Sequence, residues 1–220
     1  MVQDRSISHQ SIGSNTRIIL VRHGRTNFNV RGKVQGGGSL DAVGLIQASA
    51  LADHLRETPI AMIYTSPAIR AVRTAQFIAE PHQLKIIKKK ELSDLNYGIF
   101  RNMLLPIARK TAPTLWAQWD QAPQSVKFPG GESLLDLRLR VLRFMEAAID
   151  RHPNVTILAV THDSVIRSTI SVIRGEDDSS HNVSGLSVGV GSVTVIEFTD
   201  SGACIINQGS VEHLEGINEG

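Results

Sequence analysis

The sequence predicts an α/β fold, a three-layer sandwich in which helices cover both faces of a mostly parallel central sheet. Short runs of branched apolar residues at 17–21 (RIILV) and 155–160 (VTILAV) are typical of strands buried on both faces. Longer segments with apolar residues at helical spacing lie between such runs. Because strands and helices alternate along the chain, the strands are expected to run mostly parallel.

The elements are expected in a regular order, with one interruption. The segment 91–130 holds both tryptophans and several prolines, and we interpret it as an excursion from the sheet. Ser66 and Pro67 are interpreted as the N-cap and first residue of a helix. Strands are predicted at 17–21, 61–65, 84–88, 155–160, 192–198 and 203–207, and helices at 42–56, 67–79, 132–150 and 164–172.

Composition excludes several classes of protein. The chain has 220 residues and a net charge of +2, which argues against a nucleic-acid partner. No apolar run approaches the roughly 18 residues that span a bilayer, and a single cysteine cannot form an internal disulfide. Residues 1–15 are polar and are predicted to be a flexible segment before one domain at 16–220. We expect a soluble, cytoplasmic protein that does not bind membranes, and an edge strand near 203–207 could support a homodimer.

Two histidines follow the two most apolar strands directly. His23 comes after RIILVR and His162 after VTILAVT. In open α/β sheets, ligands bind at the carboxyl ends of strands near a topological switch point. Each histidine alone fits a buried residue that only completes the packing at a strand end, but two imidazoles at one sheet edge favour a site.

Arginines and other donors lie close to these histidines in the sequence. Arg22 and Asn29 flank His23, while Arg70 and Arg73 lie in the first turns of the next predicted helix, where anions are favoured. Arginine binds phosphate oxygens bidentately, so the set predicts a phosphate site around a nucleophilic imidazole. Arg73 also fits a solvated helix face.

Four segments in this order resemble the histidine phosphatase superfamily, in its phosphoglycerate mutase-like branch. They are LVRHGRTNFN at 20–29, TSPAIRAVRTA at 65–75, FPGGES at 128–133 and AVTHDSVIR at 159–167. The resemblance covers about residues 17 to 199. It places the family's second arginine at Arg70 and not at Arg73.

The resemblance implies phosphoryl transfer in two steps. His23 would attack phosphorus and become a phosphohistidine that water hydrolyses, while Arg22, Arg70 and His162 surround the transferring group and Asn29 helps to bind it. Fixed cations lower the barrier because charge develops on the phosphoryl oxygens. The sequence has no carboxylate cluster with metal-ligand spacing, so neither a metal nor a cofactor is expected.

The sequence departs from the family pattern at the proton donor. Counting back four residues from Gly98 gives Asp94, where the family commonly has a glutamate. Asp163 follows His162 directly and resembles the donor of the acid phosphatase branch. We expect Asp94 to be the donor, with Asp163 as the alternative. Arg25 stands where glutamate or glutamine is common and is expected to add charge near the pocket mouth.

The expected activity is hydrolysis of small phosphorylated metabolites. A phosphoglycerate mutase is the first alternative, although SDLNYG lacks the acidic, basic and histidine residues of the mutase segment. A non-catalytic phosphate-binding domain and, below it, a metal-dependent hydrolase using both histidines are the others. Trp116 and Trp119 either shape a cap over the substrate or pack a short helix, and packing is preferred.

Overall fold

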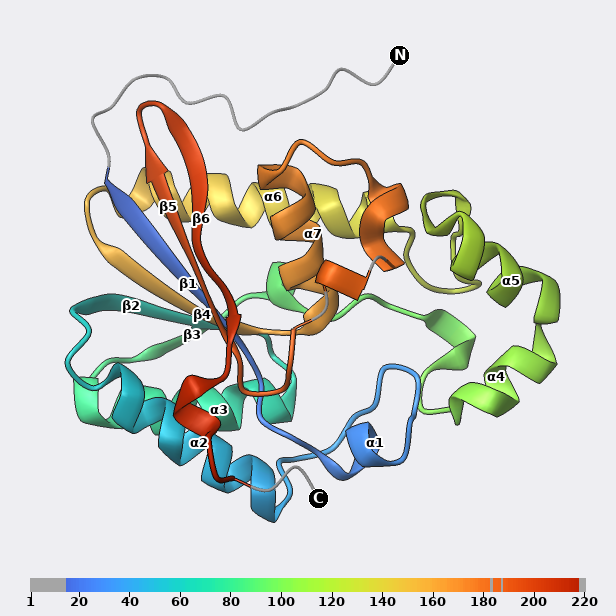
Figure 1. Ribbon diagram of the computed structural model, residues 1–220, viewed down its shortest axis with the longest axis horizontal. Helices are drawn as coiled ribbons and strands as arrows, with labels where there is room; N and C mark the ends of the chain where they lie inside the picture. Colours follow the sequence, from blue (N-terminus) through green and yellow to red (C-terminus); the bar gives the residue numbers. More distant parts are fainter. Residues whose placement is uncertain (1–14, 183, 187, 218–220) are drawn as a thin grey trace.

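A computed structural model describes residues 15–182, 184–186 and 188–217. Almost all of the predicted flexible segment at 1–15 lies outside these residues. Within them the chain forms a six-stranded sheet in the order β3-β2-β4-β1-β5-β6 (Figure 1). The strands are β1 (Thr16–Arg22), β2 (Ile60–Thr65), β3 (Ile86–Lys88), β4 (Thr156–Thr161), β5 (Val193–Thr199) and β6 (Gly202–Ser210).

The direction of the strands fits the predicted, mostly parallel sheet. β1, β4, β2 and β3 are parallel to their neighbours, whereas β5 pairs antiparallel with β1 and with β6. β4 inserts between β1 and β2, so the strand order reverses next to β1 and creates a topological switch point there. β6 lies at the sheet edge, as predicted, and the homodimer remains a prediction.

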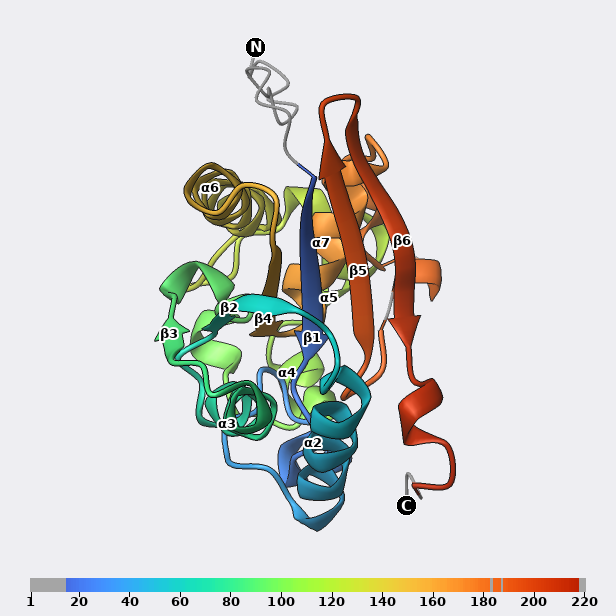
Figure 2. The same cartoon turned by 90° about the vertical axis from the view of Figure 1, so that its left-hand side faces the viewer.

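Helices cover both faces of the sheet (Figure 2). Alternate residues of β1 point to opposite faces: Ile19 and Val21 join a core with α2 and α3, and Ile18 and Leu20 join one with α6 and α7. The α-helices are α1 (Asn27–Val30), α2 (Ala42–Leu55), α3 (Ile69–His82), α4 (Leu105–Thr111), α5 (Pro113–Gln121), α6 (Leu134–Arg151) and α7 (Asp163–Ile173).

The predicted excursion at 91–130 forms a lobe of short helices beside the sheet, with α4 and α5 at its outer side (Figure 1). Trp116, Phe100 and Phe128 are buried there and join the core under α6. The 3₁₀ helices are η1 (Lys90–Leu92), η2 (Gly98–Phe100) and η3 (Pro123–Ser125), followed near the C-terminus by η4 (Asp178–Asn182), η5 (Ser184–Leu186) and η6 (Glu212–Leu214).

The structure corrects the predicted bounds of α3. The helix begins at Ile69 after Ala68, which makes no side-chain cap, so the predicted N-cap at Ser66 is wrong. The hydroxyl of Ser66 instead contacts His162. The helix also continues three residues past its predicted end at Ala79, because Pro81 in the last turn removes only one N–H donor.

Among the described residues, no helix combines the length and the apolar character needed to cross a membrane.

Candidate active site

A polar cavity of about 230 Å³ opens where β1 and β4 end, at the switch point of the sheet. It collects all six residues predicted to form the site. His23 follows β1 and His162 follows β4, and their ring centroids lie 5.1 Å apart. The residues that line it are Arg22, His23, Asn29, Lys33, Gln35, Gly36, Arg70, Asp94, Tyr97, Trp119, His162, Asp163, Ser164, Arg167, His181 and Asn182.

The ring of His23 has a defined tautomer. Its Nδ1 lies 2.7 Å from the carbonyl oxygen of Gly24, which can only accept a hydrogen bond, so Nδ1 carries the proton. Nε2 therefore presents a lone pair, which accepts a hydrogen bond of 3.0 Å from Nε of Arg70. The backbone N–H of His23 donates to Thr161 of β4, which fixes the residue against the neighbouring strand. His23 thus has a nucleophilic nitrogen facing a cation.

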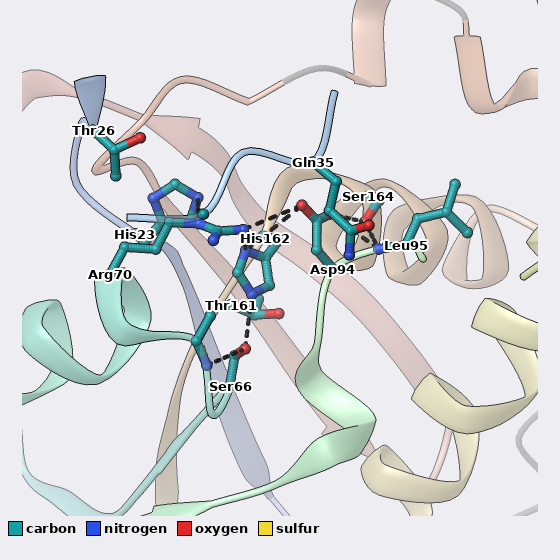
Figure 3. Close-up of polar contacts among 12 residues, drawn as sticks. His23, Thr26, Gln35, Ser66, Arg70, Asp94, Leu95, Thr161, His162 and Ser164 are labelled. Carbon is teal, nitrogen blue, oxygen red and sulfur yellow. Dashed lines mark hydrogen bonds and ion pairs between the residues drawn. The ribbon is translucent and has the colours of Figure 1, made fainter. Parts of the chain in front are cut away.

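His162 has the opposite tautomer. Its Nδ1 accepts from Nη2 of Arg70 at 3.0 Å, so its proton lies on Nε2. Nε2 lies 2.8 Å from the hydroxyl oxygen of Ser66, which accepts that proton. Figure 3 shows Arg70 beside both imidazoles, with Asp94 at its far side.

Burial and neighbouring cations keep both imidazoles neutral. Burial lowers the pKa of His23 well below its usual value, and Arg70, His162 and Arg22 lower it further. Burial likewise lowers the pKa of His162, with contributions from Arg70 and Arg22. The pKa of Arg70 is lowered by its own burial, although Asp94 opposes this. A neutral His23 is the form that can attack an electrophile.

Two further predicted residues lie at the same end of the cavity. Arg22 donates through Nη1 to the carbonyl oxygen of Val188, and its buried Nε has no hydrogen-bond partner among the described residues. The side-chain oxygen of Asn29 accepts from the backbone and the hydroxyl of Thr26. The amide N–H groups of Asn29 therefore remain available for a ligand.

Asp94 is held by one of its two oxygens. Oδ1 accepts from the hydroxyl of Ser164 at 2.6 Å and from the backbone N–H of Leu95 at 3.0 Å. Oδ2 points to the cavity side, 3.3 Å from Nη2 of Arg70 and 4.0 Å from Nδ1 of His162 (Figure 3). This arrangement leaves one carboxylate oxygen beside the two imidazoles.

The FPGGES turn fixes the backbone that follows Asp94. Gly98 has a φ of +55°, and a Cβ there would lie 2.0 Å from the carbonyl oxygen of Pro129. A Cβ on Gly131 would lie 2.2 Å from the carbonyl oxygen of Asn96, so both positions need glycine. Arg140 of α6 donates to the carbonyl oxygen of Asp94 at 3.0 Å. This turn therefore lies outside the cavity and supports the segment that carries Asp94.

Asp163, the alternative donor, has a different set of partners. It accepts from Nε of Arg167 at 2.7 Å and from the backbone N–H of Val188 at 3.1 Å, and it lies 3.9 Å from Nη1 of Arg22. Both oxygens of this carboxylate face cations or N–H groups. The geometry favours a structural carboxylate that anchors the Val188 segment beside the cavity.

Two arginines near the motifs lie elsewhere. Arg25 does not line the cavity, and its Nε donates to Asp41, the N-cap of α2, at 3.0 Å. The expectation that it adds charge at the pocket mouth is therefore wrong. Arg73 donates to Gln76 and lies over the ring of Phe77, as the alternative of a solvated helix face predicts.

The residues that the sequence analysis missed lie mainly on the outer wall of the cavity. Trp119 borders the cavity, whereas Trp116 packs in the core. His181 of η4 is buried, and its pKa is lowered to about 4, first by burial and then by Arg167. These positions lie in irregular segments with no pattern to reveal them. Ser164 and Arg167 lie within a matched segment, where α7 spacing already places Asp163 and Arg167 on one face.

No group of three or more histidine, cysteine, aspartate or glutamate side chains in the described ranges is arranged to hold a metal ion.

Comparisons with known proteins agree with the predicted family, fold and enzyme class. The model of the histidine phosphatase superfamily (branch 1) matches residues 18–208. Phosphoserine phosphatase 1 of Hydrogenobacter thermophilus is 34% identical over 73% of this chain and 77% of its own length. Metal-independent phosphoserine phosphatase of Arabidopsis thaliana is 28% identical over 92% and 84%.

Among solved structures, Bacillus stearothermophilus YhfR superposes with a TM-score of 0.87 at 27% identity, over 91% of this chain and 100% of that one. The fold, the family model and these relatives agree. The chain belongs to the histidine phosphatase superfamily, branch 1, and is a phosphatase.

Proposed function

We propose that this phosphatase hydrolyses small phosphorylated metabolites through a phosphohistidine on His23, without a metal ion. The observation that carries the proposal is the tautomer of His23, with Nδ1 held by the carbonyl of Gly24 and the Nε2 lone pair facing Arg70 in the cavity. Two relatives named as phosphoserine phosphatases make phosphoserine the first substrate to test.

In the first step, the Nε2 lone pair of His23 attacks phosphorus and the bond from phosphorus to the ester oxygen breaks. Arg70 releases Nε2 as phosphorus approaches and turns its N–H groups to the phosphoryl oxygens. Arg22, Asn29 and His162 supply the other donors around these oxygens. Donors already in place stabilise the charge that develops on them in the transition state.

The leaving oxygen takes its proton from the carboxyl group of Asp94. The position of Oδ2 beside Arg70 and His162 supports this role, since Oδ1 is bound by Ser164 and Leu95. In the second step, Asp94 takes a proton from water, the water oxygen attacks phosphorus and the bond to Nε2 breaks. Inorganic phosphate leaves and both residues regain their starting forms.

Trapping the intermediate tests the proposal. Brief incubation with a ³²P-labelled phosphomonoester should label the protein, with a bond that is labile in acid and stable in base. Activity and labelling should both survive EDTA. Complete loss with EDTA, restored by Mg²⁺ or Zn²⁺, would overturn the metal-free mechanism in favour of the metal-dependent alternative.

The remaining alternatives are separated by product analysis. A mutase converts 3-phosphoglycerate to 2-phosphoglycerate faster than it releases inorganic phosphate, whereas a phosphatase does the reverse. A non-catalytic phosphate-binding domain would bind phosphate and show neither turnover nor labelling. We expect phosphate release to dominate with every ester in the panel.

A further inference from the structure

The charges that line the cavity do not balance with a phosphate group alone. Four cationic side chains and two carboxylates line it in the part of the chain that the structure describes. His23, His162 and His181 add no charge, because burial lowers the pKa of each. A bound phosphate dianion offsets the surplus of two positive charges only while Asp94 is ionised.

The proposed reaction changes this balance, because Asp94 must hold a proton before it can donate one. The lining then has one positive charge more than the phosphate dianion offsets. An uncompensated charge in a partly enclosed site is unfavourable unless the ligand supplies the opposite charge. The charge balance therefore requires one more anionic group on the substrate.

Lys33 is the cation in the cavity without a carboxylate partner among the described residues. Arg70 pairs with Asp94, and both Arg22 and Arg167 face Asp163. The ammonium of Lys33 instead lies over the ring of Phe28, 4.3 Å from its centroid. Lys33 is half-buried, so a ligand that replaces its remaining water gains from the charge.

The segment that carries Lys33 is held in place on both sides. Lys33 forms an antiparallel bridge with Leu104, and the backbone N–H of Leu105 donates to Gly32. Gly36 lies so close to Phe28 that a Cβ on it would be 2.3 Å from the Cβ of that residue. Asn29, a proposed phosphate ligand, lies four residues before Lys33. One short segment therefore presents a phosphate donor and a free cation to the same cavity.

We propose that Lys33 is a specificity-determining residue that binds a carboxylate on the leaving group, so the preferred substrates are compact phosphorylated hydroxy or amino acids. This proposal rests on the proposed function, because it needs Asp94 as the proton donor. The cavity of about 230 Å³ suits a compact leaving group of this kind.

Two pairs of substrates isolate the carboxylate. Phosphoserine differs from phosphoethanolamine, and 3-phosphoglycerate from glycerol 3-phosphate, chiefly by that group. In each pair the wild-type enzyme should prefer the carboxylate ester by roughly 10- to 100-fold in kcat/KM, the size expected of a hydrogen bond to a charged group. Lys33→Met should bring both ratios close to one, mainly through KM, and Lys33→Arg should keep most of the preference.

Lys85→Met is the matched control. Lys85 is exposed and directly precedes β3, at the sheet edge opposite the cavity, so its loss should leave both ratios unchanged. A preference that survives in Lys33→Met, or no preference in the wild type, would overturn the role of Lys33. If p-nitrophenyl phosphate still labels His23 in that case, the proposed function stands. Absence of turnover and labelling with every ester would overturn both.

Discussion

The two ends of the cavity are built in different ways. The inner end comes from the sheet: His23 and His162 follow adjacent parallel strands, and Arg70 lies in the first turn of α3. The outer wall comes from irregular segments, among them Tyr97 after η1, Trp119 in the α4–α5 lobe and His181 in η4. Rigid elements hold reacting groups more precisely than loops do. The comparison assigns chemistry to the inner end and substrate choice to the outer wall.

The two ends also differ in how many of their polar atoms are bonded. At the inner end, both nitrogens of His23 and of His162 have partners within the protein. On the outer wall, the ring nitrogens of His181 have no hydrogen bond among the described residues, and Lys33 has no carboxylate partner. Groups that are already bonded to one another are preorganised for chemistry, whereas unbonded groups that border a cavity are available to a ligand.

The same substitution at both ends tests this division most strongly. His23→Asn removes the nucleophile, so kcat should fall by at least roughly 10³-fold and the phosphoenzyme should disappear. His181→Asn removes the same ring from the outer wall, and it should keep the phosphoenzyme and a kcat within about tenfold of the wild type. Steady-state kinetics and ³²P labelling measure both. A labelled His23→Asn enzyme would show that the nucleophile lies elsewhere.

Asp94→Asn tests the proton donor within the inner end. With alkyl phosphates, kcat should fall by roughly the 10²–10⁴-fold that general acid catalysis contributes. With p-nitrophenyl phosphate the loss should be much smaller, because its leaving group barely needs a proton. Asp163→Asn is the matched control and should show no such dependence on the leaving group. The reverse result would make Asp163 the donor and contradict the geometry.

Much of the inner end could be predicted from the sequence. The strands before His23 and His162 are the most apolar runs of the chain, and parallel neighbours bring their ends together. Arg70 could be distinguished from Arg73 by its place in the second matched segment, and only Arg70 reaches the cavity. These residues were predictable because regular elements and local motifs determine where they lie.

The outer wall could not be predicted in the same way. Lys33 and His181 enter the cavity through contacts between segments that are distant in the sequence and have no periodicity. Ser66 was interpreted as a helix cap because Ser-Pro is a common start of helices, yet its hydroxyl binds His162, 96 residues further along the chain. Such long-range hydrogen bonds leave no local signal.

Acid should destabilise the protein through its neutral outer-wall histidine. The pKa of His181 is about 4 in the folded protein and about 6.5 when unfolded, so the unfolded chain takes up a proton first as the pH falls. Stability from this group is complete above pH 6.5 and is lost progressively as the pH falls toward 4.

Denaturant unfolding at pH 7 and pH 5 measures this loss. Between these values the wild type should lose roughly 2 kcal/mol more unfolding free energy than His181→Asn does. The comparison across pH cancels the packing that the substitution removes. Equal losses in both proteins would mean that His181 is charged when folded, which would add a cation to the outer wall.

Ser66→Ala should have the smallest effect, although it acts at the inner end. Ser66 is fully buried, and its hydroxyl accepts the Nε2 proton of His162, which keeps Nδ1 free for Arg70. Its loss should lower kcat/KM about tenfold for alkyl and aryl esters alike and reduce stability by about 1 kcal/mol. Ser168→Ala is the control, because that buried hydroxyl on α7 has no hydrogen-bond partner in the described residues. If the two variants match in kinetics and in unfolding, the bond from Ser66 to His162 contributes nothing, and Arg70 alone determines the tautomer of the second histidine.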